Sequence, residues 1–235
     1  MTAAVDRGDL EEAARQGALA GPNVVEQALR SKARATVLAG IVAAPTTEDR
    51  AELLPALARV AGAGDRRTAI PAARAARTIA EQLAKRDLAD DLTPDDIQTW
   101  RATFEALAVT KGRAIEVRVA SLETAAALEH VVDPTQLGFD LAHVLGDADP
   151  VLRTAALELV PRPTAAALRA TIVPALADAD SAVVLAAAQT LCADVADDPK
   201  GVKSALGADG AAKIKAIVKA HPNAIESRDA ARCVK

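Results

Sequence analysis

Aromatic residues are scarce in this sequence. They make up 1% of the 235 residues: one tryptophan, two phenylalanines and no tyrosine. β-Sheets draw on aromatic and β-branched side chains, whereas much of the 51% hydrophobic content here is alanine. Alanine is the best helix former and has no side-chain entropy to lose on folding. The composition therefore predicts an all-α protein.

The usual sequence signatures of catalysis are also absent. The chain has no HExxH, CxxC or GxSxG motif, no Walker-type phosphate loop and no GxGxxG turn. Its three histidines, His130, His143 and His221, are scattered along the chain. We therefore expect a protein that is not an enzyme, with no catalytic residue, no cofactor and no metal site.

Long apolar runs are missing as well. None approaches the ~18 residues that a membrane helix needs, and the acidic start of the chain does not fit a signal peptide. We therefore expect no membrane association. A cytoplasmic location is the default expectation, and a periplasmic one stays open if a leader has been removed.

The formal net charge is −4 at pH 7, which gives no reason to expect a nucleic-acid partner. The charges are nevertheless unevenly distributed. Residues 30–86 hold 11 Lys or Arg against 5 Asp or Glu, whereas residues 119–199 hold 3 against 12. Residues 200–235 are basic again, with 8 against 3. These blocks are either solvated surface or a surface that steers a charged partner.

Two neighbouring segments repeat one pattern. Residues 141–159 read LAHVLGDADPVLRTAALEL, and residues 172–191 read IVPALADADSAVVLAAAQTL. Each has an apolar helix, an Asp-Ala-Asp turn, a valine and a second helix rich in Ala and Leu, and the two turns lie 31 residues apart. A fixed period of this size is typical of stacked helical repeats, in which neighbouring helix pairs bury each other's apolar stripes.

Partial copies of the pattern occur earlier in the chain. Residues 53–57 (LLPAL) match residues 172–176 (IVPAL), and residues 117–122 (VRVASL) match the second half of the repeat. A proline inside the first helix, an aspartate in the turn, then valine, arginine and paired alanines resemble the HEAT-repeat (armadillo-like) family. The resemblance covers most of residues 24–234.

The resemblance implies a right-handed α-solenoid of about six antiparallel helix pairs, forming a single domain over residues 1–235. We expect N-terminal capping helices at 1–45, central repeats at 46–198 and a C-terminal capping repeat at 199–235. Single helices are expected near 24–43 and 48–61. Breaks between helices are expected at Gly21–Pro22, Pro45–Thr47, Thr93–Pro94, Lys111–Gly112, Asp133–Pro134, Pro161–Pro163, Asp198–Pro199 and His221–Pro222.

Such stacks bind partners along a concave face lined by the second helix of each pair. Arginines gather on the expected second helices, and we interpret them as a basic stripe that receives a protein or an acidic peptide. The alternative is that they are solvated and pair with local acids. The stripe consists of Arg34, Arg67, Arg74, Arg77 and Arg113.

The leading functional hypothesis is a non-catalytic protein–protein interaction scaffold. One alternative is a structural component that self-associates through an end repeat; the oligomeric state is open. Another is a cofactor-handling enzyme of the HEAT type, as the chromophore lyases are. Proteins with HEAT repeats also include di-iron hydroxylases and DNA glycosylases. This chain lacks the His-Glu pairs of the former and the basic, aromatic-lined face of the latter.

The aspartates of the two repeated turns are candidate cation ligands. Each loop lacks the later glycine and glutamate of a calcium loop. We therefore expect these aspartates to cap the helices that follow and to pair with Arg118 or Arg153 of adjacent repeats. The four residues are Asp147, Asp149, Asp178 and Asp180.

Cys192 and Cys233 fall at similar positions in consecutive second helices when Ala187–Ala188 is aligned with Ala230–Ala231. Stacking of those helices brings the two cysteines together. Either two reduced thiols are buried side by side, or a disulfide ties the last repeat to the stack. A disulfide would indicate an oxidising compartment.

Overall fold

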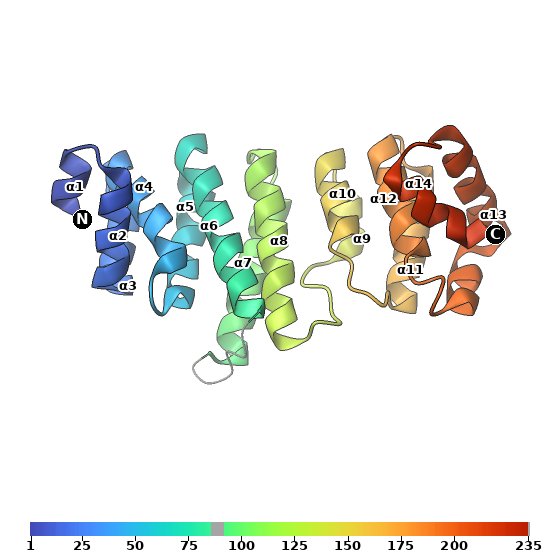
Figure 1. Ribbon diagram of the computed structural model, residues 1–235, viewed down its shortest axis with the longest axis horizontal. Coiled ribbons are helices and arrows are strands. Elements are labelled where there is room, and N and C mark those ends of the chain that lie inside the picture. Colours follow the sequence, from blue (N-terminus) through green and yellow to red (C-terminus); the bar gives the residue numbers. More distant parts are fainter. Residues whose placement is uncertain (86–91, 235) are drawn as a thin grey trace. The chain divides into compact units, whose positions relative to one another are not determined.

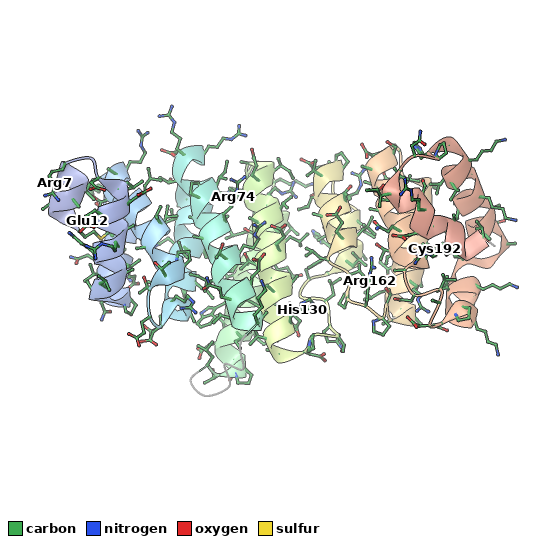
Figure 2. All side chains as sticks on the ribbon, viewed as in Figure 1. Arg7, Glu12, Arg74, His130, Arg162 and Cys192 are labelled. Atoms are coloured by element: carbon green, nitrogen blue, oxygen red, sulfur yellow. A yellow bond between two sulfur atoms is a disulfide. The ribbon has the colours of Figure 1, made fainter. Side chains whose placement is uncertain are left out.

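The computed structural model describes residues 1–85 and 92–234, and along them the chain is helical with no β-strand (Figure 1). The all-α prediction is confirmed. The helices form two compact units, Met1–Pro134 and Thr135–Lys235. Most of the described charged side chains are exposed or half-buried (Figure 2), whereas Arg118, Arg169 and Asp194 are buried. Within the described residues, no helix has the length and apolarity that a membrane crossing requires.

The first unit contains eight described α-helices and two short 3-10 helices. The α-helices are α1 (Thr2–Asp6), α2 (Leu10–Ala20), α3 (Pro22–Leu29), α4 (Arg34–Ala43), α5 (Leu54–Ala63), α6 (Arg66–Ala84), α7 (Pro94–Val109) and α8 (Ile115–Val132), and the 3-10 helices are η1 (Ala44–Thr46) and η2 (Arg50–Leu53). Helices α3 and α4, α5 and α6, and α7 and α8 pack as successive pairs. The second helices α4, α6 and α8 contact one another in turn, and so do the first helices α3, α5 and α7.

Local capping signals mark the starts of α2 and α7 correctly. Thr93 precedes α7, and its hydroxyl accepts a hydrogen bond from the Asp96 N–H at 3.2 Å. Asp9 caps α2 in the same way through the Glu12 N–H. The expected breaks at Gly21–Pro22, Lys111–Gly112 and Asp133–Pro134 all fall between helices. These boundaries are confirmed because caps and glycine or proline act over only three or four residues.

The single helix expected near 24–43 is wrong, since the chain turns between α3 and α4. The Ser31 hydroxyl accepts from the Ala33 N–H at 3.1 Å, a local bond that competes with the helix. No glycine or proline marks this turn. Pro55 and Pro174 each lie second in the helix that follows a junction between 3-10 and α geometry. At both prolines the chain therefore changes helix type.

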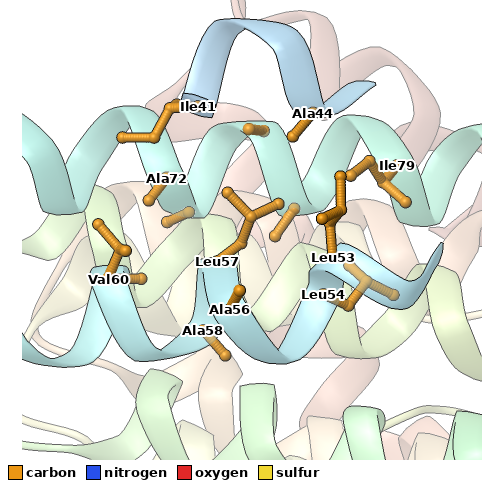
Figure 3. Packing of buried hydrophobic residues seen from close by; sticks show 14 of the residues in the cluster. Ile41, Ala44, Leu53, Leu54, Ala56, Leu57, Ala58, Val60, Ala72 and Ile79 are labelled. Carbon is orange, nitrogen blue, oxygen red and sulfur yellow. The ribbon is translucent and has the colours of Figure 1, made fainter. Parts of the chain in front are cut away.

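The core of the first unit extends from α2 to α8, and a large part of it lies between α5 and α6. The apolar positions Leu53, Leu54, Leu57 and Val60, which recur at helical spacing, are 7% exposed or less. Figure 3 shows Leu57 pointing from α5 towards α6. The facing surface of α6 is rich in buried alanine, and small side chains allow the two helix backbones to approach closely.

The second unit repeats the alternation of helices. Its elements are α9 (Leu141–Leu145), α10 (Pro150–Glu158), α11 (Ala166–Ile172), η3 (Val173–Ala177), α12 (Ser181–Cys192), α13 (Pro199–Ala220), α14 (Ile225–Ala230) and η4 (Ala231–Val234). Helices α10, α12 and α14 contact one another in turn, and α11 contacts both α9 and α13. Helix α13 bends at Gly207, whose φ of 58° lies in the left-handed region that favours glycine.

The aspartates of the repeated turns act as caps and ion-pair partners, as predicted. Asp149 caps α10 and Asp180 caps α12. The Arg153 guanidinium binds both carboxylate oxygens of Asp178, at 2.7 and 2.9 Å, and donates to the Asp147 carbonyl at 2.8 Å. Arg153 thus joins two consecutive turns of this unit.

An ion cluster around the buried Arg169, which no sequence motif marks, holds α11 against the segment after α12. Arg169 is 4% exposed and contacts Asp194 at 3.4 Å and Asp198 at 2.5 Å. Asp194 also accepts from the Thr164 N–H at 2.6 Å. A β-carbon at Gly201 would collide with the Asp198 carboxylate and the Arg169 guanidinium, so a larger residue there would displace these two side chains.

Cys192 and Cys233 form a disulfide, with their Cα atoms 5.5 Å apart. Of the two states that the sequence left open, the structure therefore has the bonded one. Cys192, at the end of α12, is buried (Figure 2). Between Ile225 and Val234, only Ser227 and Ala230 are buried. The covalent bond thus adds to the packing of α14 against α12 and of η4 against α13.

Acid is expected to weaken the second unit. Arg153 holds the pKa of Asp178 below its ordinary value, and Arg169 does the same to the pKa of Asp198. Because these pKa values are depressed by folding, the stabilisation is present above about pH 4 and is lost as the pH falls through the folded-state values. Arg153→Met should cost about 1–3 kcal/mol at neutral pH and flatten the acid slope in thermal unfolding of the full chain. Parallel pH profiles for the two proteins would contradict this.

Reduction of the disulfide is expected to loosen the C-terminal segment. Dithiothreitol should lower the unfolding free energy of the oxidised protein by about 2–4 kcal/mol, as for disulfides that close loops of this length. Amide exchange should rise first in α14. The variant with Cys192→Ala and Cys233→Ala is the control, because reductant should leave its unfolding unchanged. An equal response of both proteins, or none in either, would show that the bond does not constrain the segment.

Candidate functional site

The predicted basic stripe lies at the start of the second helices of the first unit. Arg34 is the first residue of α4, and Arg67 is the second residue of α6. Arg113 immediately precedes the N-cap of α8. Arg74 lies seven residues, about two turns, beyond Arg67 on α6. Arg34, Arg67 and Arg113 therefore lie at the starts of these helices, and Arg74 lies near the middle of α6.

An ion pair and a pocket show that the starts of α4, α6 and α8 are neighbours. The Arg66 guanidinium of α6 bonds the Glu116 carboxylate of α8 at 2.5 Å. A pocket of about 270 Å³ lies between the turn before α4 and the turn before α6. It is lined by Lys32, Arg34 and Arg59 among others. We name the following set the basic edge: Lys32, Arg34, Arg59, Arg67, Arg74 and Arg113.

Most cations of the basic edge have no carboxylate partner among the described residues. Arg34, Arg67 and Arg74 are exposed and make no ion pair there. Asp65 also lines the pocket. Its Oδ1 accepts hydrogen bonds from the N–H groups of Arg67 and Thr68 and so caps α6. Cations therefore outnumber acids along this edge, with Asp65 as the carboxylate that lines the pocket.

Arg77 differs from the other predicted stripe residues. Its guanidinium contacts Glu123 of α8 at 2.9 Å and Glu81 of α6 at 3.4 Å. The hydrogen bond to Glu123 raises the pKa of Arg77 above its ordinary value. Glu116, bonded to Arg66, has a lowered pKa, owing first to a backbone hydrogen bond and then to Arg66. Arg66 and Arg77 thus hold α6 against α8, and we leave them out of the basic edge.

A second hollow lies between α5 and α7, on the first helices of two consecutive pairs. This groove, which we name the α5–α7 groove, has a volume of about 570 Å³. Its lining is mainly apolar and includes Trp100, Phe104 and Leu107 of α7, with Leu54 of α5. The charged side chain that lines it is Arg59. The tryptophan is evident in the sequence, but no sequence pattern marks the groove.

The aspartates of the repeated turns do not form a metal-binding cluster. Across residues 1–85 and 92–234, no three His, Cys, Asp or Glu side chains are grouped so as to hold an ion. The aspartates of the repeated turns instead accept hydrogen bonds from backbone N–H groups and from Arg153. The acidic turns are therefore explained by helix capping and ion pairing.

Comparison with known proteins yields no match to any family model and none to any curated protein. The resemblance to HEAT repeats consequently depends on the residues of the repeat and on the order in which the helices pack.

The two classes of arginine on α6 should respond differently to neutralisation. Arg77→Gln leaves half-buried Glu123 without its partner and should lower the unfolding free energy by about 1 kcal/mol. Arg74→Gln, the matched control, removes an exposed cation from the same helix and should change it by less than about 0.5 kcal/mol. Urea unfolding measures both. A larger loss at Arg74 than at Arg77 would reverse the assignment.

Proposed function

We propose that the protein is a non-catalytic interaction scaffold that binds an acidic segment of a protein partner through the basic edge. In this proposal the helix pairs form a HEAT-like array over residues 1–235, and the partner lies along the second-helix side. The alternation of first and second helices within each unit supports such an array. Two further features support the array: Pro174 lies where α11 changes to a 3-10 helix, and Arg153 joins two consecutive aspartate turns.

The observation that carries the proposal is the exposed charge of Arg34, Arg67 and Arg74, which form no ion pair with a described residue. Arg34 also lines an open pocket with Lys32 and Arg59. Guanidinium groups bind carboxylates through two parallel hydrogen bonds and remain charged at any working pH. A cluster of them raises the encounter rate with acidic segments and disfavours basic ones. An acidic protein surface or peptide is therefore the partner that this edge fits.

The disulfide bears on where the protein works. Structural disulfides persist in oxidising compartments and are rare in the cytosol. The bond between Cys192 and Cys233 therefore favours an oxidising compartment over the cytoplasmic default, and we include it in the proposal.

Charge reversal tests the basic edge. The variant combining Arg34→Glu, Arg67→Glu and Arg74→Glu should bind a labelled oligo-glutamate peptide at least about tenfold more weakly, a change of about 1.4 kcal/mol. Fluorescence anisotropy at low and physiological salt provides the measurement. The same variant should fail to retain acidic partners from extracts of the native cells.

The matched control reverses three exposed lysines of α13: Lys203→Glu, Lys213→Glu and Lys215→Glu. This variant has the same net charge but an intact basic edge, so its peptide affinity should stay near that of the unmodified chain. Equal losses in both variants would mean that only net charge matters. Undiminished binding by the arginine variant would refute the site.

A further inference from the structure

The α5–α7 groove and the pocket of the basic edge share one residue. Arg59, on α5, lines both the α5–α7 groove and the pocket of the basic edge. Its guanidinium reaches the Leu29 carbonyl at 3.4 Å, a long contact that leaves most of its donors unused. A ligand that extends from one hollow to the other therefore passes over an exposed cation.

The α5–α7 groove offers apolar contact and few free donors. The hydroxyls of Thr99, Thr103 and Thr110, which line it, donate to carbonyls four residues earlier in α7. The rest of the wall is largely hydrocarbon, including Pro55 and Leu107. At about 570 Å³, the groove falls in the size range of small-molecule and side-chain pockets. It suits a bulky apolar group.

We propose that a single peptide segment of the partner occupies both hollows. A bulky apolar side chain of that segment lies in the α5–α7 groove against Trp100, and neighbouring carboxylates pair with Arg59, Lys32 and Arg34. This deepens the proposed function and rests on it. The recognised element is then acidic with an apolar anchor, whereas the basic edge alone would accept any acidic stretch.

The apolar side chain and the carboxylates of the segment contribute to binding in different ways. Buried apolar or aromatic anchors in pockets dominate the affinity of protein interfaces, while exposed charges contribute mainly to encounter and selectivity. Carboxylates next to the anchor place their charge over Arg59, where the groove meets the basic pocket. An uncharged apolar ligand forgoes these contacts, and a peptide without the anchor forgoes the groove.

Trp100 is the single tryptophan of the chain, so its fluorescence reports on the groove directly. Three labelled peptides serve as probes: one with a phenylalanine among glutamates, one with alanine in its place, and one with the phenylalanine among glutamines. We expect the first to shift the Trp100 emission saturably and to bind at least about tenfold more tightly than either of the others.

Filling the groove provides a matched pair of variants on one helix. Ala106 is exposed and lines the groove, whereas Ala102 is exposed on α7 outside the groove lining. Ala106→Phe should abolish the Trp100 shift and reduce the affinity for the phenylalanine peptide to that of the alanine peptide, while Ala102→Phe should change neither. Arg59→Gln is a second, independent variant that leaves the groove empty. It should weaken the glutamate peptides and spare the glutamine peptide.

The outcomes separate this inference from the proposed function. If the alanine and phenylalanine peptides bind equally and Trp100 does not respond, the basic edge stands and the anchored segment is wrong. If the glutamine peptide binds as tightly as the glutamate one, the groove takes an apolar ligand without acidic neighbours and the proposal fails. If no peptide binds, both proposals fail.

Discussion

The close packing of alanine side chains around α6 is the constraint on which the first unit depends. Helix α6 contacts α4, α5 and α8 at once, and its buried surface contains the alanines Ala69, Ala72, Ala73, Ala75, Ala76 and Ala80. Side chains this small let three helices approach one backbone, with Leu57 and Ile79 filling the remaining space (Figure 3). Because α4 and α8 are held against the same helix, their N-terminal turns lie near its N-terminal turn. The basic edge is a consequence of that alignment.

What the sequence predicts well is local. Thr93, Asp149 and Asp180 each cap the helix that follows them, because the bond from a cap to a backbone N–H spans two or three residues. The pairing of Arg153 with Asp178 was also predictable, although 25 residues separate them. This pairing was expected from the repeat, because equivalent turns of stacked consecutive repeats lie next to each other. The composition alone was enough for the all-α prediction.

What the sequence does not reveal depends on non-local packing. Arg169 and Asp194 belong to no motif, and only the fold brings them together in a buried pair. The turn at Ser31 carries a hydroxyl bond that many helical serines do not make. The α5–α7 groove is a space between two helices, so its existence depends on how far apart they lie. The sequence indicated apolar residues on both helices but gave no reason for them to stay uncovered.

The arginines of α6 show how packing assigns a role to each member of one residue type. Arg66 and Arg77 lie opposite Glu116 and Glu123 of α8, which are seven residues apart and so project from one side of that helix. Arg67 and Arg74, also seven residues apart, form no ion pair with a described residue, although the charge of Arg74 helps to lower the pKa of Glu116. A cation paired with a half-buried acid stabilises the helix contact, because its removal leaves that acid without a partner. An unpaired cation stabilises little, and its charge is available to another molecule. The same helix therefore separates stability from recognition, and changes to its binding charges need not disturb its fold.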